Sequence, residues 1–192
     1  MSPANRTPLL QAAASILAAA GGRLPITSLN KALFYLDVVS LRDHGVVITG
    51  TTYLALPAGP VVAKYEKRLV QALEDAGVAQ QDDADDGMTK PVCLVGEVQP
   101  TDFSNQQVTL IQRVGAWASK RSASDLSEYS HRNDGWKIAW DQGLGSKLPA
   151  KPINLRIAMQ QILDDDPWLE SLPIGDVADA FASADSDVGV DL

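Results

Sequence analysis

The sequence has few of the residues from which metal sites and disulfides are built. Cys93 is the single cysteine, and the two histidines, His44 and His131, lie far apart. A structural metal site needs about four ligands at working spacings, and an intrachain disulfide needs two cysteines. We therefore expect no metal, no disulfide and no cofactor. A lone cysteine also fits a reducing compartment, so we expect a cytoplasmic protein.

Long apolar runs are also missing. No run reaches the roughly 18 apolar residues that a membrane span needs. The apolar stretch from Leu9 to Ala20 resembles a short signal peptide, but Gln11 and Ser15 interrupt it. Thr7-Pro8 before it is a helix start and Gly21-Gly22 after it is a helix stop, so we favour a helix of a cytosolic protein over a cleaved signal.

Basic residues are outnumbered. Sixteen Lys and Arg stand against 24 Asp and Glu, which gives a net charge of -8. An acidic chain repels phosphate backbones, so nucleic-acid binding is disfavoured and a basic partner is favoured. The acidic residues gather at 82–86, at 164–166 and after 173. We expect one domain over residues 1–172, followed by an acidic flexible tail over 173–192 that is disordered alone.

A catalytic constellation is not recognisable either. The chain has no Gly-x-Ser-x-Gly nucleophile motif, and the loop 143–147 lacks the spacing of a phosphate-binding loop. Ser127 and His131 are one helical turn apart, which favours a local hydrogen bond over Ser–His catalysis. Glu128 and His131 can share a helix face, but no third metal ligand is identifiable. We expect a protein that is not an enzyme.

The most informative stretch begins with an apolar helix predicted over 29–44. Ser28 is placed to cap its first amides, and Gly45 is placed for a left-handed residue at its end. A helix that is apolar on two faces is buried on two faces, so we expect this helix to be central. One face carries Leu29, Ala32, Leu33 and Leu36, and the nearly opposite face carries Phe34, Val38 and Leu41.

A strand is predicted next, over 46–56, because the segment is rich in Val, Ile, Thr and Tyr. Pro57-Ala58-Gly59-Pro60 then breaks the chain. Pro60 suits the first turn of a helix, so we predict that this motif turns the strand directly into a helix over 61–76 that Gly77 ends. As a second role, the free amides of that helix start can receive a carboxylate.

The complete pattern predicts an α+β fold that is predominantly α-helical, with a helical core and a small β-sheet or hairpin. The order helix, helix, strand, helix, loop, strand resembles a winged helix by topology alone. Its wing tip, 82–86, is acidic, so we expect a wing-like scaffold that does not grip DNA. The other predicted elements are helices over 8–20, 122–131 and 153–163, a helix after the Ser104–Gln107 capping box, a loop over 79–90 and a strand over 91–98.

Two separated motifs carry a family resemblance. The first reads LNKALFYLDVVSLRDHG…ITGTTYLALPAGPV, and the second is Leu126 to His131 followed by Trp136-Lys137. Over roughly 8–140 the chain resembles the Panacea domain, the SocA-like antitoxin family that also includes phage-associated proteins. The resemblance implies an antitoxin that neutralises a toxin, encoded by a neighbouring gene, by direct protein binding. Some members resemble proteolytic adaptors that deliver the toxin to an AAA+ protease such as ClpXP.

The polar run from Ser127 to His131 has two interpretations that the sequence leaves open. It either locks the fold through hydrogen bonds or lines the partner surface. Large aromatics favour interfaces, although each is also a candidate for the core. An alternative function, a winged-helix-like transcription regulator of its own operon, rests on element order alone. The candidate partner-binding residues are Tyr53, Pro57, Gly59, Pro60, Glu128, Tyr129, His131 and Trp136.

Overall fold

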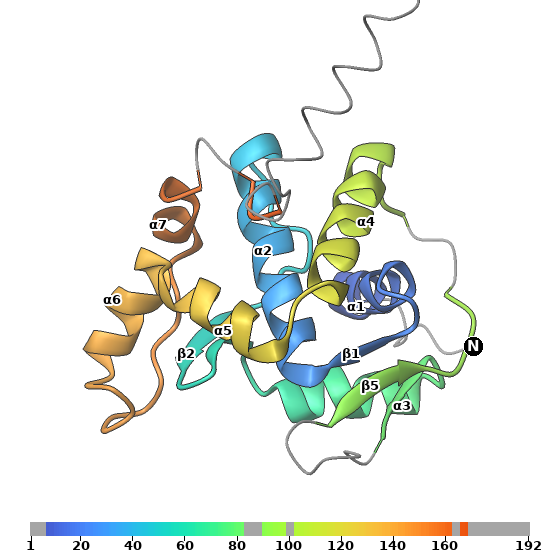
Figure 1. The fold of residues 1–192 in the computed structure, drawn as a ribbon, viewed down its shortest axis with the longest axis horizontal. Coiled ribbons are helices and arrows are strands. Elements are labelled where there is room, and N and C mark those ends of the chain that lie inside the picture. Colours follow the sequence, from blue (N-terminus) through green and yellow to red (C-terminus); the bar gives the residue numbers. More distant parts are fainter. Residues whose placement is uncertain (1–6, 83–89, 99–101, 163–165, 169–192) are drawn as a thin grey trace, which may run out of the picture.

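The computed structural model describes residues 7–82, 90–98, 102–162 and 166–168. Its helices surround a central helix, α2, with two small antiparallel sheets beside them (Figure 1). The predicted α+β, predominantly helical class is confirmed. The helices are α1 (Pro8–Ala19), α2 (Ile26–His44), the π-helix η2 (Glu66–Gln71), α3 (Ala72–Asp75), α4 (Asn105–Ser119), α5 (Ala123–His131), α6 (Asp134–Gln142) and α7 (Leu155–Gln160). The strands are β1 (Arg23–Pro25), β2 (Tyr53–Leu56), β3 (Gly59–Val62), β4 (Ala79–Gln81) and β5 (Pro91–Leu94).

Helix α2 is buried all round. Every residue from Leu29 to Ser40 is at most 2% exposed, because α1, α4, α5, α7 and β3 pack around it. The prediction of a central helix buried on two faces is therefore confirmed, and the burial is more complete than predicted. The helix also carries Asn30, Lys31 and Asp37 into the core. Buried polar groups cost stability unless they are hydrogen-bonded. Each of these three side chains therefore needs a hydrogen-bond partner from the elements packed around α2.

Of the two predicted ends of α2, only the C-terminal end is confirmed. Gly45 has φ 70° and ends the helix, as predicted. Ser28 is not the cap, because the helix already begins at Ile26. β1 pairs with β5, and the Ile26 amide donates to the Lys90 carbonyl at 3.2 Å. An amide at the helix start is thus satisfied by a neighbouring chain segment, and the Ser28 hydroxyl has no hydrogen-bond partner among the described residues.

The Pro-Ala-Gly-Pro motif is a hairpin turn, and the prediction of a strand-to-helix turn was wrong. β2 pairs with β3 with Leu56 opposite Gly59, so Pro57 and Ala58 form the tip. Gly59 has φ 102°, in a region that favours glycine. The Val62 amide donates to Asn30 Oδ1 at 2.8 Å, which holds the segment after the motif extended against α2. Because no helix begins at Pro60, the carboxylate site predicted there does not exist.

The strand and the helix that were predicted on either side of this motif have different limits in the structure. The strand predicted over 46–56 is formed only by β2, and the helix predicted over 61–76 begins at η2 and continues as α3. A π-helix is rare, and here it begins at Glu66, two residues after Lys64, which has φ 57°. Gly77 has φ 65° and follows the helix end, as predicted.

The second sheet has the strand order β1-β5-β4 with antiparallel neighbours. Its β5 confirms the first half of the strand predicted over 91–98, and β4 occupies the start of the predicted loop. Residues 83–86 of the predicted wing tip, the domain limit at 172 and the tail 173–192 lie outside the described residues. Because β1 and the β2–β3 hairpin add to the expected element order, the comparison with a winged helix stays a prediction.

Local capping signals were reliable in the helices of the second half. Ser104 and Gln107 form the predicted capping box of α4, and Ser122 with Asp125 forms a second box at α5. Asn133 caps α6. Helix α7 is shorter than the helix predicted over 153–163. Among the described helices, none combines the length and the apolar character needed to cross a membrane.

Candidate partner-binding site

The tip of the β2–β3 hairpin is fastened to α5 and α6 by side chains. Three successive carbonyl groups of the turn each accept a hydrogen bond. The donors therefore bring the two sequence motifs together, because the turn belongs to the first motif and the helices belong to the second. The pairs are Trp136 Nε1 to Leu56 (3.2 Å), the His131 imidazole to Pro57, and Ser127 Oγ to Ala58 (3.1 Å).

Gly59 allows this turn to approach the helices closely. A Cβ atom at Gly59 would overlap Ser130 Oγ and would lie 3.0 Å from Lys31 Cε. The Ser130 hydroxyl donates to the Ser127 carbonyl at 2.9 Å, so it is held in place within α5. The backbone of the turn is therefore in direct contact with α5 on one side and with α2 on the other.

The ring of His131 is part of an aromatic stack. It lies 4.2 Å from the Trp136 ring at an interplanar angle of 26°, and Trp136 in turn stacks on Trp140 at 5.3 Å. Burial and the nearby Lys31 charge lower the pKa of His131 below its usual value, although the Pro57 carbonyl and Glu128 oppose this change. The imidazole is therefore largely neutral at pH 7.

The predicted partner-binding residues divide into two groups. Tyr53, Gly59, Pro60 and Trp136 are buried, so Tyr53, which was a candidate both for the interface and for the core, packs in the core. Its ring belongs to the core because its hydroxyl bonds a buried carboxylate. The others are accessible: Pro57 and Glu128 are exposed, and Tyr129 and His131 are half-buried. Partner binding by the accessible residues stays a prediction.

The run from Ser127 to His131 contributes both to the fold and to the surface. Ser127 and His131 hold the hairpin turn, while Glu128 faces solvent. Fold locking is thus a role of this run, and part of the same run remains available at the surface.

A buried carboxylate that the sequence reasoning missed joins β2 to α2. Tyr53 donates its hydroxyl to Asp37 Oδ2 at 2.7 Å, and the Thr49 amide donates to Asp37 Oδ1 at 2.9 Å. The Thr49 hydroxyl also bonds Asp37. Burial raises the pKa of Asp37 despite these bonds. An aspartate in the middle of an apolar helix was the signal that could have revealed this network.

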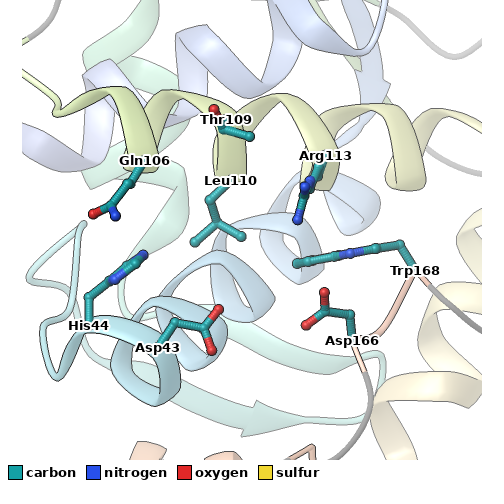
Figure 2. A pocket seen from close by; sticks show the side chains of 8 residues that line it. All are labelled: Asp43, His44, Gln106, Thr109, Leu110, Arg113, Asp166 and Trp168. Carbon is teal, nitrogen blue, oxygen red and sulfur yellow. The ribbon is translucent and has the colours of Figure 1, made fainter.

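A groove of about 240 Å³ lies between the end of α2 and an outer face of α4 (Figure 2). Figure 2 shows Leu110 and the Trp168 indole pointing into the same space as two carboxylates. Arg42 binds the Asp43 and Asp166 carboxylates, and it donates to the Ile162 carbonyl at 2.7 Å. The groove is large enough for one side chain of a partner. Its lining residues are Asp43, His44, Gln106, Thr109, Leu110, Arg113, Asp166 and Trp168.

The described residues thus form a mostly helical fold in which side chains of α5 and α6 hold the β2–β3 hairpin in place. They include no group of three or more His, Cys, Asp or Glu side chains arranged to hold a metal ion. The chain belongs to the antitoxin SocA-like, Panacea domain family, whose model matches residues 29–137. No curated protein and no solved structure matches the chain.

The family match confirms the resemblance predicted from the two motifs. It begins at Leu29 in α2 and ends at Lys137 in α6, so it contains the hairpin, the second motif and the hydrogen bonds that join them. The family is one of antitoxins, which supports an antitoxin role and, in general terms, a toxin as partner.

Proposed function

We propose that the protein neutralises a cognate protein toxin, encoded by a neighbouring gene, by forming a stoichiometric complex without catalysing a reaction. The family match over residues 29–137 carries this proposal. The bonding of the second motif supports the lack of catalysis. Ser127 and His131, the pair that a Ser–His mechanism would use, are both engaged in holding the hairpin turn.

Two surfaces suit such a complex. One is the hairpin tip with the outer face of α5, where Pro57 and Glu128 are exposed. The other is the groove between α2 and α4, where the Trp168 indole and the buried Leu110 provide an apolar contact. Aromatic side chains in such pockets contribute much of the binding free energy at interfaces. The net charge of -8 accelerates the encounter with a basic toxin at low salt.

Co-expression tests the proposal. The neighbouring gene expressed alone should arrest growth, and expression of this chain with it should restore growth. The two purified proteins should then elute as one complex of fixed stoichiometry. If no neighbouring gene is toxic alone and rescued by this chain, the proposal fails.

A proteolytic adaptor is a special case of this function. An adaptor shortens the half-life of its toxin when an AAA+ protease is active, whereas a sequestering antitoxin lengthens it. A pulse-chase measurement of the toxin, with and without this chain and in strains with and without the protease, separates the two mechanisms.

A further inference from the structure

Lys31 is a lysine that the proposed function does not yet use. It lies in the middle of α2 and is 0% exposed. Its Nζ atom has no hydrogen-bond partner among the described residues. Burial lowers the pKa of its amine to about 8, and no carboxylate of the described residues offsets that effect. An ammonium group removed from water without a counter-charge costs several kcal/mol, so the charged form of Lys31 lowers the free energy of unfolding.

A second nitrogen atom without a partner lies beside the same turn. His131 Nε2 is buried and has no hydrogen-bond partner among the described residues. The Lys31 charge acts on this imidazole and lowers its pKa. Gly59 lies over the lysine, since a Cβ there would be 3.0 Å from Lys31 Cε and 3.5 Å from Nζ. Two buried nitrogen atoms without partners, from α2 and α5, are therefore adjacent to one hairpin turn.

We propose that Lys31 and His131 form an anion-binding site beneath the β2–β3 turn, which takes a carboxylate supplied by the partner protein. The source of the carboxylate rests on the proposed function. The ammonium group offers three donors, and an imidazole that takes up a proton offers a donor in place of its lone pair. A carboxylate between them supplies the missing counter-charge, and the site takes up protons as the anion binds.

The fastened turn provides the route to this site. Pro57 and Ala58 at its tip are exposed, whereas Gly59 beneath them is buried. Side-chain donors such as Ser127 hold the tip in place. Opening of the turn moves Gly59 aside, and free acetate or a carboxylate of the partner then reaches Lys31. A carboxylate suits this site better than a doubly charged phosphate, because Glu128 lies near enough to His131 to affect its pKa and repels a second negative charge.

NMR titration of the full chain with labelled lysine side chains tests the site. The free protein should show a Lys31 pKa of about 8. Saturating sodium acetate, compared with sodium chloride at equal ionic strength, should raise this pKa by at least one unit. Acetate affinity should then fall about tenfold for each pH unit above the pKa of the free site. The resonance of Lys147, an exposed lysine, should not respond. Absence of an acetate-specific change in Lys31 would overturn the proposal.

The same titration on the complex with the neighbouring toxin identifies the source. A raised Lys31 pKa in the complex supports a carboxylate from the partner. If the complex forms but the Lys31 pKa stays near 8, the antitoxin function stands and this inference fails. An acetate response without a response in the complex overturns the partner as the source.

Two matched substitutions complete the test. Lys31→Met keeps the length of the side chain without its charge, and Lys147→Met removes the same charge from an exposed position. Acetate should raise the Tm of the native chain more than chloride does, because it binds the folded protein. Lys31→Met should abolish this rise and weaken the toxin complex at least tenfold, whereas Lys147→Met should behave like the native chain. A Lys31→Met protein that binds the toxin with native affinity refutes the proposal. If that variant does not fold, the titrations of the native chain decide.

Discussion

Trp136 donates its indole N–H to the carbonyl of Leu56 at 3.2 Å, across 80 positions of the sequence. This bond joins the hairpin of the first family motif to the helix that ends the second. Together with the bonds from Ser127 and His131, it holds the exposed turn against α5 and α6.

The contribution of this bond can be measured with Trp136→Phe. The substitution removes the donor and leaves the Leu56 carbonyl without it, so we expect the free energy of unfolding to fall by about 1–3 kcal/mol. Trp140→Phe is the control, because Trp140 stacks on the same ring but is only half-buried. Urea denaturation of both variants provides the comparison. Equal losses in the two variants would mean that the Leu56 bond contributes nothing specific.

Gly59 should tolerate no side chain. Gly59→Ala places a Cβ on Ser130 Oγ at a φ of 102°, so we expect a loss of about 3 kcal/mol. Ser130→Ala in the same chain should restore about 1 kcal/mol, because it removes the overlap and leaves the backbone strain. Gly22→Ala is the control: its φ is 91° but its surroundings are open, so it measures strain alone. Thermal unfolding of all variants tests the order, and a Gly59→Ala loss no larger than that of Gly22→Ala contradicts it.

The Tyr53 hydroxyl should matter most when Asp37 is ionised. Tyr53→Phe removes a donor to Asp37 Oδ2, and we expect a loss of about 1–3 kcal/mol at pH 7.5. The pKa of Asp37 is already raised by burial, so its ionised form weakens the fold as the pH rises through this pKa. Without the hydroxyl the pKa rises further, and the loss should therefore be smaller at acidic pH. Denaturation at pH 4.5 and 7.5 checks this, and a pH-independent loss would contradict it.

Because Lys31 is buried, we expect the free energy of unfolding to increase toward alkaline pH. The pKa of its amine is about 8 in the fold against 10.5 as the ordinary value. Between these values the unfolded chain binds more protons than the folded chain, so the lysine's contribution to the free energy of unfolding rises with pH. Below pH 8 the fold bears the full cost, about 3 kcal/mol. Lys31→Met should thus be the more stable protein at pH 7, and its advantage should shrink toward pH 10. A constant difference, measured by denaturation at several pH values, would argue against a buried charge.

The groove beside α4 should contribute to toxin binding. Trp168→Ala removes the large apolar wall of the groove, and we expect the toxin complex to weaken at least tenfold, about 1.4 kcal/mol. Val95→Ala is the control, because Val95 is an exposed apolar residue that does not line the groove. Isothermal titration calorimetry with the toxin measures both variants, and circular dichroism checks their folding. Native affinity in Trp168→Ala would place the interface elsewhere, for instance at the hairpin tip.

The elements that were predicted correctly depend on neighbours in the sequence. The apolar faces of α2, the left-handed Gly45 and the Ser104–Gln107 capping box are all recognised within a few residues, because helix geometry brings such positions together. The presence of both family motifs was likewise recognised in the sequence, as a resemblance. The fastening of one motif to the other was not, since each bond joins distant segments.

Long-range partners settled the features that local patterns left ambiguous or misled. Pro60 suits a helix start as well as a strand, and the bond from the Val62 amide to Asn30, 32 positions earlier, selects the strand. Ser28 suits a helix cap, but β5 supplies the Lys90 carbonyl for the amide of Ile26 instead. The local sequence thus allows a small set of backbone conformations. The tertiary structure selects one of them, because distant groups supply the hydrogen bonds that its free amides and buried polar groups need.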